Sequence, residues 1–107
     1  MIRIRVSSRG DSALRLRVTG HAGFAAAGND VLCAAVSVLA ENLGESLRLL
    51  LNADLELEEG DGLYDVRLSD AAASRETDLL FASAILGLRS IALAHPDRIV
   101  FESEELE

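Results

Sequence analysis

The chain contains few of the residues that build disulfides, metal centres or aromatic binding sites. It has one cysteine, two histidines, one proline and no tryptophan, and aromatic residues make up only 4% of its 107 residues. A single cysteine cannot form an internal disulfide, which suits a reducing compartment. One cysteine and two histidines are also too few for a typical structural zinc site. We therefore expect neither a bound metal nor a cofactor.

Lysine is missing altogether. The 10 basic residues are all arginines, and they face 18 acidic residues, so the formal net charge is −8. This balance argues against direct binding to nucleic acid, which requires a basic surface. It favours encounter with a basic protein partner through long-range attraction. Composition alone supports the simpler explanation, that the acids keep the protein soluble.

Long hydrophobic runs are missing as well. The most apolar segment, residues 31–51, contains Glu41, Glu45 and Arg48 and does not match a membrane span. The first residues also lack the apolar core of a secretory signal. Half of the residues are apolar, which suffices for one core in a chain of this length. We expect one cytoplasmic domain over residues 1–107, with no membrane association.

Alternating apolar and charged residues predict two β-hairpins. In residues 2–18, isoleucines, leucines and valines alternate with arginines on both sides of a polar turn at 7–11. Residues 55–68 repeat the pattern around Gly60, Asp61 and Gly62, with mostly acidic residues on the polar face. If the hairpins share one sheet, the arginines and acids of these faces could pair across strands.

Apolar residues at three- and four-residue spacing predict two helices. The first is expected from about Asp30 to Leu51, with Asn29 or Asp30 as its N-cap. The second runs from the low seventies to His95, where Pro96 ends it, and its apolar content suits a largely buried helix. The core-facing residues expected in the first helix are Val31, Ala34, Ala35, Val38, Leu39, Leu43, Leu47 and Leu50.

A short last strand at 99–101 precedes an acidic tail at 102–107. The element order is therefore ββαββαβ. Its simplest packing is one mixed or antiparallel sheet with both helices on one face, a two-layer α+β domain.

The segment between the first hairpin and the first helix carries reactive side chains. Cys33 falls in the first helical turn, where free N–H groups and the helix dipole stabilise a thiolate. The same N–H groups could receive the oxyanion of a tetrahedral intermediate. His21 precedes Cys33 across a loop rich in glycine and alanine and could act as its base. Spacing alone does not show that the two side chains meet, and a lone cysteine in an apolar helix is most often a core residue.

Asp30 and Ser37 lie on the same helix face as Cys33. Asp30 either orients His21 or caps the helix, and we favour a capping or loop-ordering role, because a carboxylate close to the sulfur would oppose thiolate formation. Ser37 is expected to act in packing or hydrogen bonding below the cysteine. The glycines of the loop, Gly20, Gly23 and Gly28, give it backbone freedom and let a substrate backbone come close.

At this segment the sequence resembles the ribosomal-processing cysteine protease family, called Prp. The family pattern runs Gly-His-Ala, a small flexible loop, then Gly-x-Asp, two hydrophobic residues and Cys-Ala-Ala-x-Ser. The chain meets it with Gly20-His21-Ala22, Gly28, Asp30, Cys33-Ala34-Ala35 and Ser37. The element order and the length match too, so the resemblance covers essentially the whole chain. Asn29 stands where the family often has a lysine. We expect this difference to affect substrate recognition more than the chemistry.

The resemblance implies a Cys–His endopeptidase that removes an N-terminal extension from a large-subunit ribosomal protein. It implies Cys33 as nucleophile, His21 as general base, Asp30 and Ser37 as supporting residues, and a homodimer. Such a substrate is basic, which gives the acidic composition a second meaning. The competing hypothesis is a non-catalytic acidic binding module, or a ribosome-assembly factor, for a basic ribosomal protein. A redox sensor ranks third, because the chain has no resolving cysteine.

Overall fold

The computed structural model describes residues 1–21 and 30–107, and its elements follow the predicted order ββαββαβ. The first hairpin is β1 (Ile2–Arg9) and β2 (Ser12–Gly20), and the second is β3 (Leu55–Gly60) and β4 (Leu63–Leu68). The helices are α1 (Val31–Glu45), which continues into a π-helical segment at Ser46–Leu50, and α2 (Arg75–Ala94) after a short 3₁₀ turn at Asp70–Ala72. The last strand is β5 (Ile99–Glu105).

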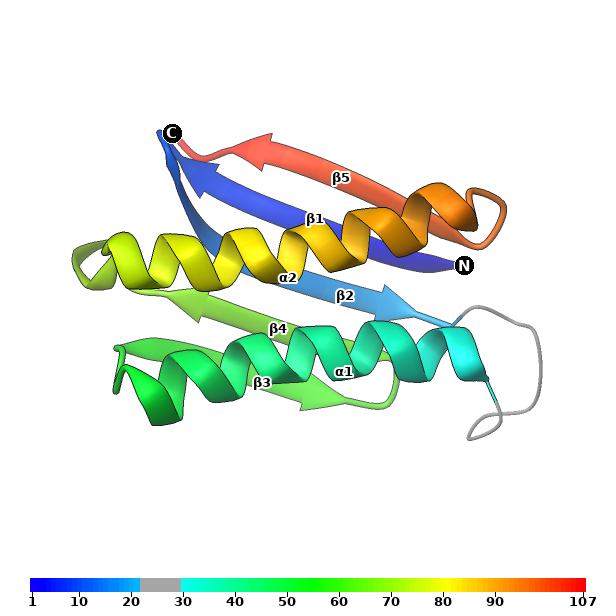
Figure 1. Ribbon diagram of the computed structural model, residues 1–107, viewed down its shortest axis with the longest axis horizontal. Helices are drawn as coiled ribbons and strands as arrows, with labels where there is room; N and C mark the ends of the chain where they lie inside the picture. The colour runs from blue at the N-terminus through cyan, green and yellow to red at the C-terminus, as the bar shows by residue number, and fades with distance from the viewer. Residues whose placement is uncertain (22–29) are drawn as a thin grey trace.

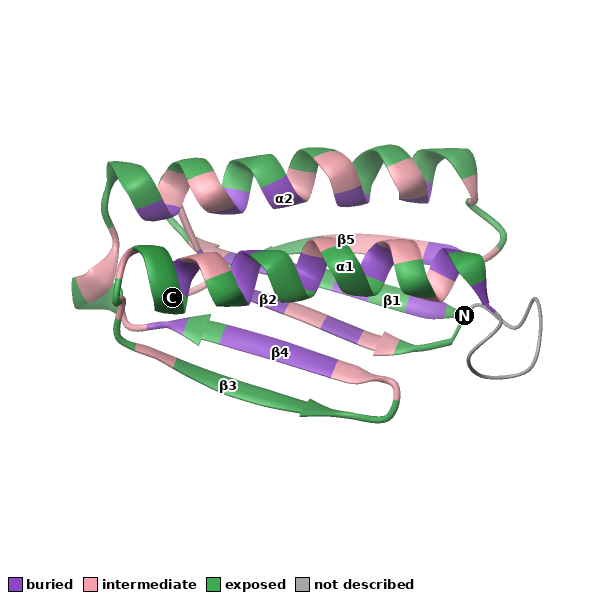
Figure 2. Ribbon diagram, turned by 60° about the horizontal axis from the view of Figure 1, so that its bottom comes forward, coloured by how far each residue is buried: buried purple, intermediate pink, exposed green. Residues whose placement is uncertain are grey.

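The five strands form one mixed sheet in the order β3-β4-β2-β1-β5. β1 runs parallel to β5, and the other neighbouring strands are antiparallel. Both helices lie on the same face of this sheet (Figures 1 and 2). The two-layer α+β fold expected from the sequence is therefore confirmed.

Alternation along the strands builds the core between the sheet and the helices. Ile2, Ile4 and Leu16 are 1%, 0% and 0% exposed, and they face Phe81 and Leu88 of α2, which are fully buried. Because successive strand residues point to opposite faces, the arginines between them project from the other side of the sheet. The hydrophobic pattern thus fixes which face of the sheet the helices cover.

The uncovered face of the sheet carries a set of ion pairs. Asp65 of β4 pairs with Arg17 across the β2–β4 register, and it accepts hydrogen bonds from Arg15 at 3.0 and 2.6 Å and from Arg17 at 2.8 Å. Glu102 of β5 pairs with Arg3 and Arg5 of β1. Pairing between the arginines of one hairpin and an acid of the other is confirmed.

The last strand is longer than the sequence suggested. The expectation of a strand at 99–101 with an acidic tail was wrong, because β5 extends to Glu105 beside β1. Glu102 meets arginines of β1, and Glu104 accepts a hydrogen bond from Ser7 at 2.7 Å. A run of glutamates therefore forms a strand here, since the neighbouring strand supplies partners for its charges.

Each helix buries a narrower face than the sequence suggested. In α1 the buried side consists of Leu32, Val36, Ala40, Leu43 and Gly44, whereas Val31 and Val38 are 80% and 64% exposed. The expectation that these valines, Ala34 and Leu50 face the core was wrong, since all four are exposed. In a helix with apolar residues on several sides, periodicity does not identify the buried side.

The expectation of a largely buried second helix was also wrong. On α2 the exposed side carries Leu79, Leu86 and Leu93, and Figure 2 shows exposed residues along the outer side of both helices. By length and composition alone α2 could cross a membrane, but here its other side packs on the sheet.

Candidate active site

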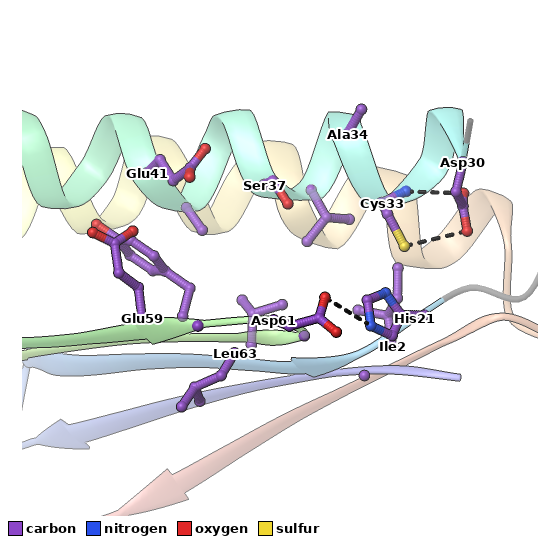
Figure 3. Close-up of a pocket in the computed structure, with 17 residues that line it drawn as sticks. Ile2, His21, Asp30, Cys33, Ala34, Ser37, Glu41, Glu59, Asp61 and Leu63 are labelled. Atoms are coloured by element: carbon purple, nitrogen blue, oxygen red, sulfur yellow. Dashed lines mark hydrogen bonds and ion pairs between the residues drawn. The ribbon is translucent and has the colours of Figure 1, made fainter. Parts of the chain in front are cut away.

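An open cavity of about 640 Å³ lies between α1, the end of β2 and the turn of the β3–β4 hairpin (Figure 3). His21, Asp30, Cys33 and Ser37 all line it, together with Gly20. The reactive residues proposed from the sequence are therefore brought to the wall of one cavity.

Asp30 and Cys33 form the start of α1. Asp30, which is 8% exposed, is the N-cap, and its Oδ1 accepts hydrogen bonds from the backbone N–H groups of Leu32 at 3.0 Å and Cys33 at 3.1 Å. Its other oxygen, Oδ2, lies 3.2 Å from the sulfur of Cys33, which donates to it. The preference for Asp30 as the helix cap is confirmed. The contact with the sulfur goes against our expectation, because a helix cap placed three residues before the thiol reaches it with its second oxygen.

This arrangement bears on where an oxyanion could be bound. Asp30 already takes the N–H groups of Leu32 and Cys33 through its side chain and that of Ala34 through its backbone carbonyl at 3.1 Å. The sequence suggested that the first helical N–H groups could receive the oxyanion. In the structure these three donors stabilise the helix start instead.

His21 follows directly after β2 and faces the hairpin turn. Its Nε2 lies 3.7 Å from Oδ1 of Asp61, and its side chain is 52% exposed. The backbone N–H of Gly20 donates to the carbonyl of Gly62 at 2.9 Å, which ties the end of β2 to the same turn. Gly20 has a φ of +88°, and a Cβ there would lie 2.2 Å from the carbonyl oxygen of Met1. A glycine is therefore required at the position that presents His21.

The nucleophile and its proposed base lie on different walls of the cavity. Figure 3 shows the thiol pointing from the first turn of α1 toward the side on which His21 lies. The partners described above are Asp30 for the thiol and Asp61 for the imidazole. The pairing of Cys33 with His21 as a catalytic dyad stays a prediction.

The remaining predicted site residues are Ser37 and the glycines of the loop. Ser37 is exposed one turn after Cys33 and lines the cavity. Gly23 and Gly28 lie outside the described residues, so the flexible substrate loop stays a prediction. In the described part of the chain, no group of three or more potential ligands could hold a metal ion.

Four polar residues that line the cavity, Glu41, Glu59, Asp61 and Tyr64, were not predicted from the sequence. Desolvation by burial, followed by the charges of Glu59, Glu45 and Glu41, raises the pKa of Tyr64 to about 12. In the sequence, Glu41 served only to argue against a membrane span, and Glu59 and Tyr64 were not considered as site residues. Only the tertiary structure brings the three elements together.

A thiol at the start of a helix and an imidazole on another wall of the same open cavity are the parts of a cysteine hydrolase. Comparison with known families supports this class. The family model described as cysteine protease Prp matches residues 1–100. The chain therefore belongs to the cysteine protease Prp family.

Solved structures share the fold over nearly the whole chain. SMU.848 from Streptococcus mutans is 31% identical, with a TM-score of 0.81 over 99% of this chain and 96% of that one. The essential ribosomal processing protease Prp from S. aureus, with a covalently linked product peptide, is 19% identical, with a TM-score of 0.87 over 96% and 99%. The same enzyme with a substrate peptide is 18% identical, with a TM-score of 0.82 over 96% of this chain and 99% of that one. A search of curated proteins found no match.

Proposed function

We propose that this protease is a cytoplasmic endopeptidase that removes the N-terminal extension of a basic large-subunit ribosomal protein. One observation carries the proposal: the thiol of Cys33 lies at the start of α1, in the same open cavity as His21, in a chain of the Prp family. The S. aureus enzyme that shares this fold is described as a ribosomal processing protease. The net charge of −8 suits a basic substrate.

The proposed reaction gives the attack to Cys33 and the proton transfers to His21. His21 takes the thiol proton, and the sulfur of Cys33 attacks the scissile carbonyl carbon to give a tetrahedral intermediate. The intermediate collapses to a thioester, and protonated His21 gives its proton to the leaving amine. Water then attacks the thioester with His21 as base, which releases the acid product and restores the thiol. Oδ1 of Asp61 lies 3.7 Å from Nε2 of His21, on the side of the hairpin turn. Asp30 holds the helix start, and Ser37 lines the cavity below the nucleophile.

The test uses peptides that span the extended N-termini of that ribosomal protein, incubated with the reduced protein and read by mass spectrometry. We expect a single cut that Cys33→Ala abolishes. Ser37→Ala is the matched control, because it changes a side chain one turn away on the same wall, and it should keep at least part of the activity. Cleavage retained by Cys33→Ala would refute the proposal. Stable binding of the peptides without any thiol-dependent cut would favour the acidic binding module.

We also propose that the protein acts as a homodimer that associates through the outer face of α2. Leu79, Leu86 and Leu93 are 70%, 72% and 76% exposed and recur every seven residues, so they form one stripe on the helix. Val31 and Val38, which are also exposed, have the same spacing on α1, the helix that packs beside α2. Exposed apolar residues gathered in this way mark an association surface.

The homodimer is tested with Leu86→Glu, which places a charge in the middle of the stripe. We expect this variant to be monomeric by sedimentation at a concentration at which the parent chain is dimeric. Leu57→Glu on β3, at another exposed leucine, is the control and should stay dimeric. A monomeric parent chain, or a dimeric and folded Leu86→Glu variant, would contradict the proposal.

A further inference from the structure

Three carboxylates beyond Asp30 line the cavity, one from α1 and two from the β3–β4 hairpin. Glu41 projects from α1, Glu59 from the end of β3, and Asp61 from the turn of the hairpin. In Figure 3, Glu41 and Glu59 lie at the end of the cavity away from Cys33, one on each wall. Among the described residues that line the cavity there is no arginine or lysine, and no described side chain pairs with Glu41 or Glu59. Among the described residues, this end of the cavity is therefore lined by acidic side chains and by no basic one, although the charge of Arg48 also reaches Tyr64.

A buried phenol lies at the same end. Tyr64 lines the cavity and is only 8% exposed, and no residue in the described ranges 1–21 and 30–107 hydrogen-bonds to its hydroxyl. The hydroxyl lies against α1 at Gly44, where a Cβ would be only 1.8 Å away. Its pKa of about 12 keeps the phenol protonated, and the charges of Glu59, Glu45 and Glu41 contribute to that value.

The distance from the nucleophile sets where a substrate would meet these groups. At about 1.5 Å per residue, Glu41 lies about 12 Å along α1 from Cys33. An extended peptide covers about 3.3 Å per residue, so about three to four residues separate the scissile bond from Glu41. The cavity thus has the thiol at one end and two carboxylates, Glu41 and Glu59, at the other, within reach of a substrate side chain.

We infer that Glu41, Glu59 and Tyr64 form a cation-binding subsite that takes an arginine or lysine side chain of the substrate, three or four residues from the scissile bond. The inference rests on the proposed function, since it assigns specificity to the same cavity. The two carboxylates bind the cationic head, and the phenol meets the substrate with its hydroxyl or its ring. Arginine is favoured over lysine, because its planar fork can reach both walls at once.

The first experiment moves a single arginine through a neutral peptide, from five residues before the cut to five residues after it. We expect kcat/KM to peak with arginine at the third or fourth position on one side of the cut. Replacing that arginine by citrulline, which has nearly the same shape and no charge, should lower kcat/KM by about tenfold or more. Equal rates for all arginine positions, or for arginine and citrulline, would overturn the subsite.

Enzyme variants test the residues directly. Glu41→Gln and Glu59→Gln should each reduce the arginine-to-citrulline ratio, and the double variant should bring it to about one. Glu58→Gln is the matched control, because it removes the same charge from the neighbouring residue of β3, which faces the other side of the sheet beside Asp65. The ratio should be unchanged in this control. Tyr64→Phe should lower kcat/KM for the arginine peptide more than for the citrulline peptide.

Failure of the subsite and failure of the protease function are distinguishable. Cys33-dependent cleavage that is indifferent to arginine would overturn the subsite and leave the function standing. If no peptide is cut, binding to the Cys33→Ala protein is measured by calorimetry with the arginine and citrulline peptides. About tenfold tighter binding of the arginine peptide, lost in Glu41→Gln/Glu59→Gln, supports the subsite without catalysis, and equal affinities overturn it.

Discussion

At the scale of single residues, Asp30 performs two tasks that oppose one another. One oxygen caps α1, and the other accepts from the Cys33 thiol. The cap helps to form the helix whose N-terminus favours a thiolate, whereas the negative charge beside the sulfur disfavours it. The two oxygens of Asp30 therefore have opposite effects on the formation of a thiolate at Cys33.

The two tasks can be separated by substitution. Serine at position 30 keeps a helix cap and removes the charge, so Asp30→Ser should retain stability to within about 0.5 kcal/mol, whereas Asp30→Ala should lose about 0.5–2 kcal/mol. Iodoacetamide should alkylate Cys33 faster in Asp30→Ser than in the parent chain at neutral pH, since no carboxylate opposes the thiolate. Alkylation that is slower in Asp30→Ser would show that the carboxylate promotes thiolate formation.

At the scale of elements, β2 and β4 are joined through a nearly buried carboxylate. Burial by itself would raise the pKa of Asp65, but the hydrogen bonds and charges of Arg15 and Arg17 outweigh burial and lower it. The side chain of Asp65 is 2% exposed, whereas those of Arg15 and Arg17 are 27% and 39% exposed. Ionised Asp65 therefore stabilises the folded chain at pH values above its unfolded pKa of about 4, and this stabilisation is lost as the pH falls through the lower folded pKa.

The Asp65→Asn variant should lose about 1–3 kcal/mol at pH 7, as measured by urea unfolding, because the amide cannot satisfy both arginines. The difference from the parent chain should shrink as the pH falls below about 4. Glu102→Gln is the control, since Glu102 pairs with arginines at a more exposed position of the same face. It should cost less than about 1 kcal/mol. A loss for Asp65→Asn that stays constant down to low pH would argue against the ion pairs.

The elements that could be predicted are those whose residues repeat along the chain. Both hairpins and both helices follow from local periodicity, and the interruption at Pro96 gave the end of α2. The extent of β5 could not be predicted, because Glu102 contacts Arg3 and Arg5 only once β5 has paired with β1. The buried face of α1 was uncertain for a related reason: its apolar residues surround the helix, and only contact with the sheet selects one side.

The candidate site likewise contains residues that could be predicted from the sequence and residues that could not. His21, Asp30 and Cys33 lie in one continuous segment, so a motif could find them. Glu59 and Tyr64 come from the second hairpin, and their approach to α1 depends on β4 pairing with β2. A local sequence pattern therefore cannot predict that Glu59 and Tyr64 line the same cavity as Cys33.

At the scale of the whole molecule, the excess of acids should act on the rate of encounter. A chain with net charge −8 attracts a basic peptide over a distance set by ionic strength. We expect kcat/KM for an arginine-containing peptide to fall several-fold when salt rises from about 0.05 to about 0.5 M, while that for the citrulline peptide changes little. Progress curves at several salt concentrations measure both. Equal salt dependence of the two peptides would mean that charge attraction does not govern association.

The two walls of the cavity differ in how much each contributes to the core. One wall belongs to α1, whose residues fill the core, and the thiol is attached to that helix. The other wall is the β3–β4 turn, and β3 is an edge strand that is mostly exposed and pairs with β4 alone. Substitutions in β3 and the turn reach the cavity with little disturbance of the core. The fold therefore allows the hairpin side of the cavity to be altered without moving the helix that carries the thiol.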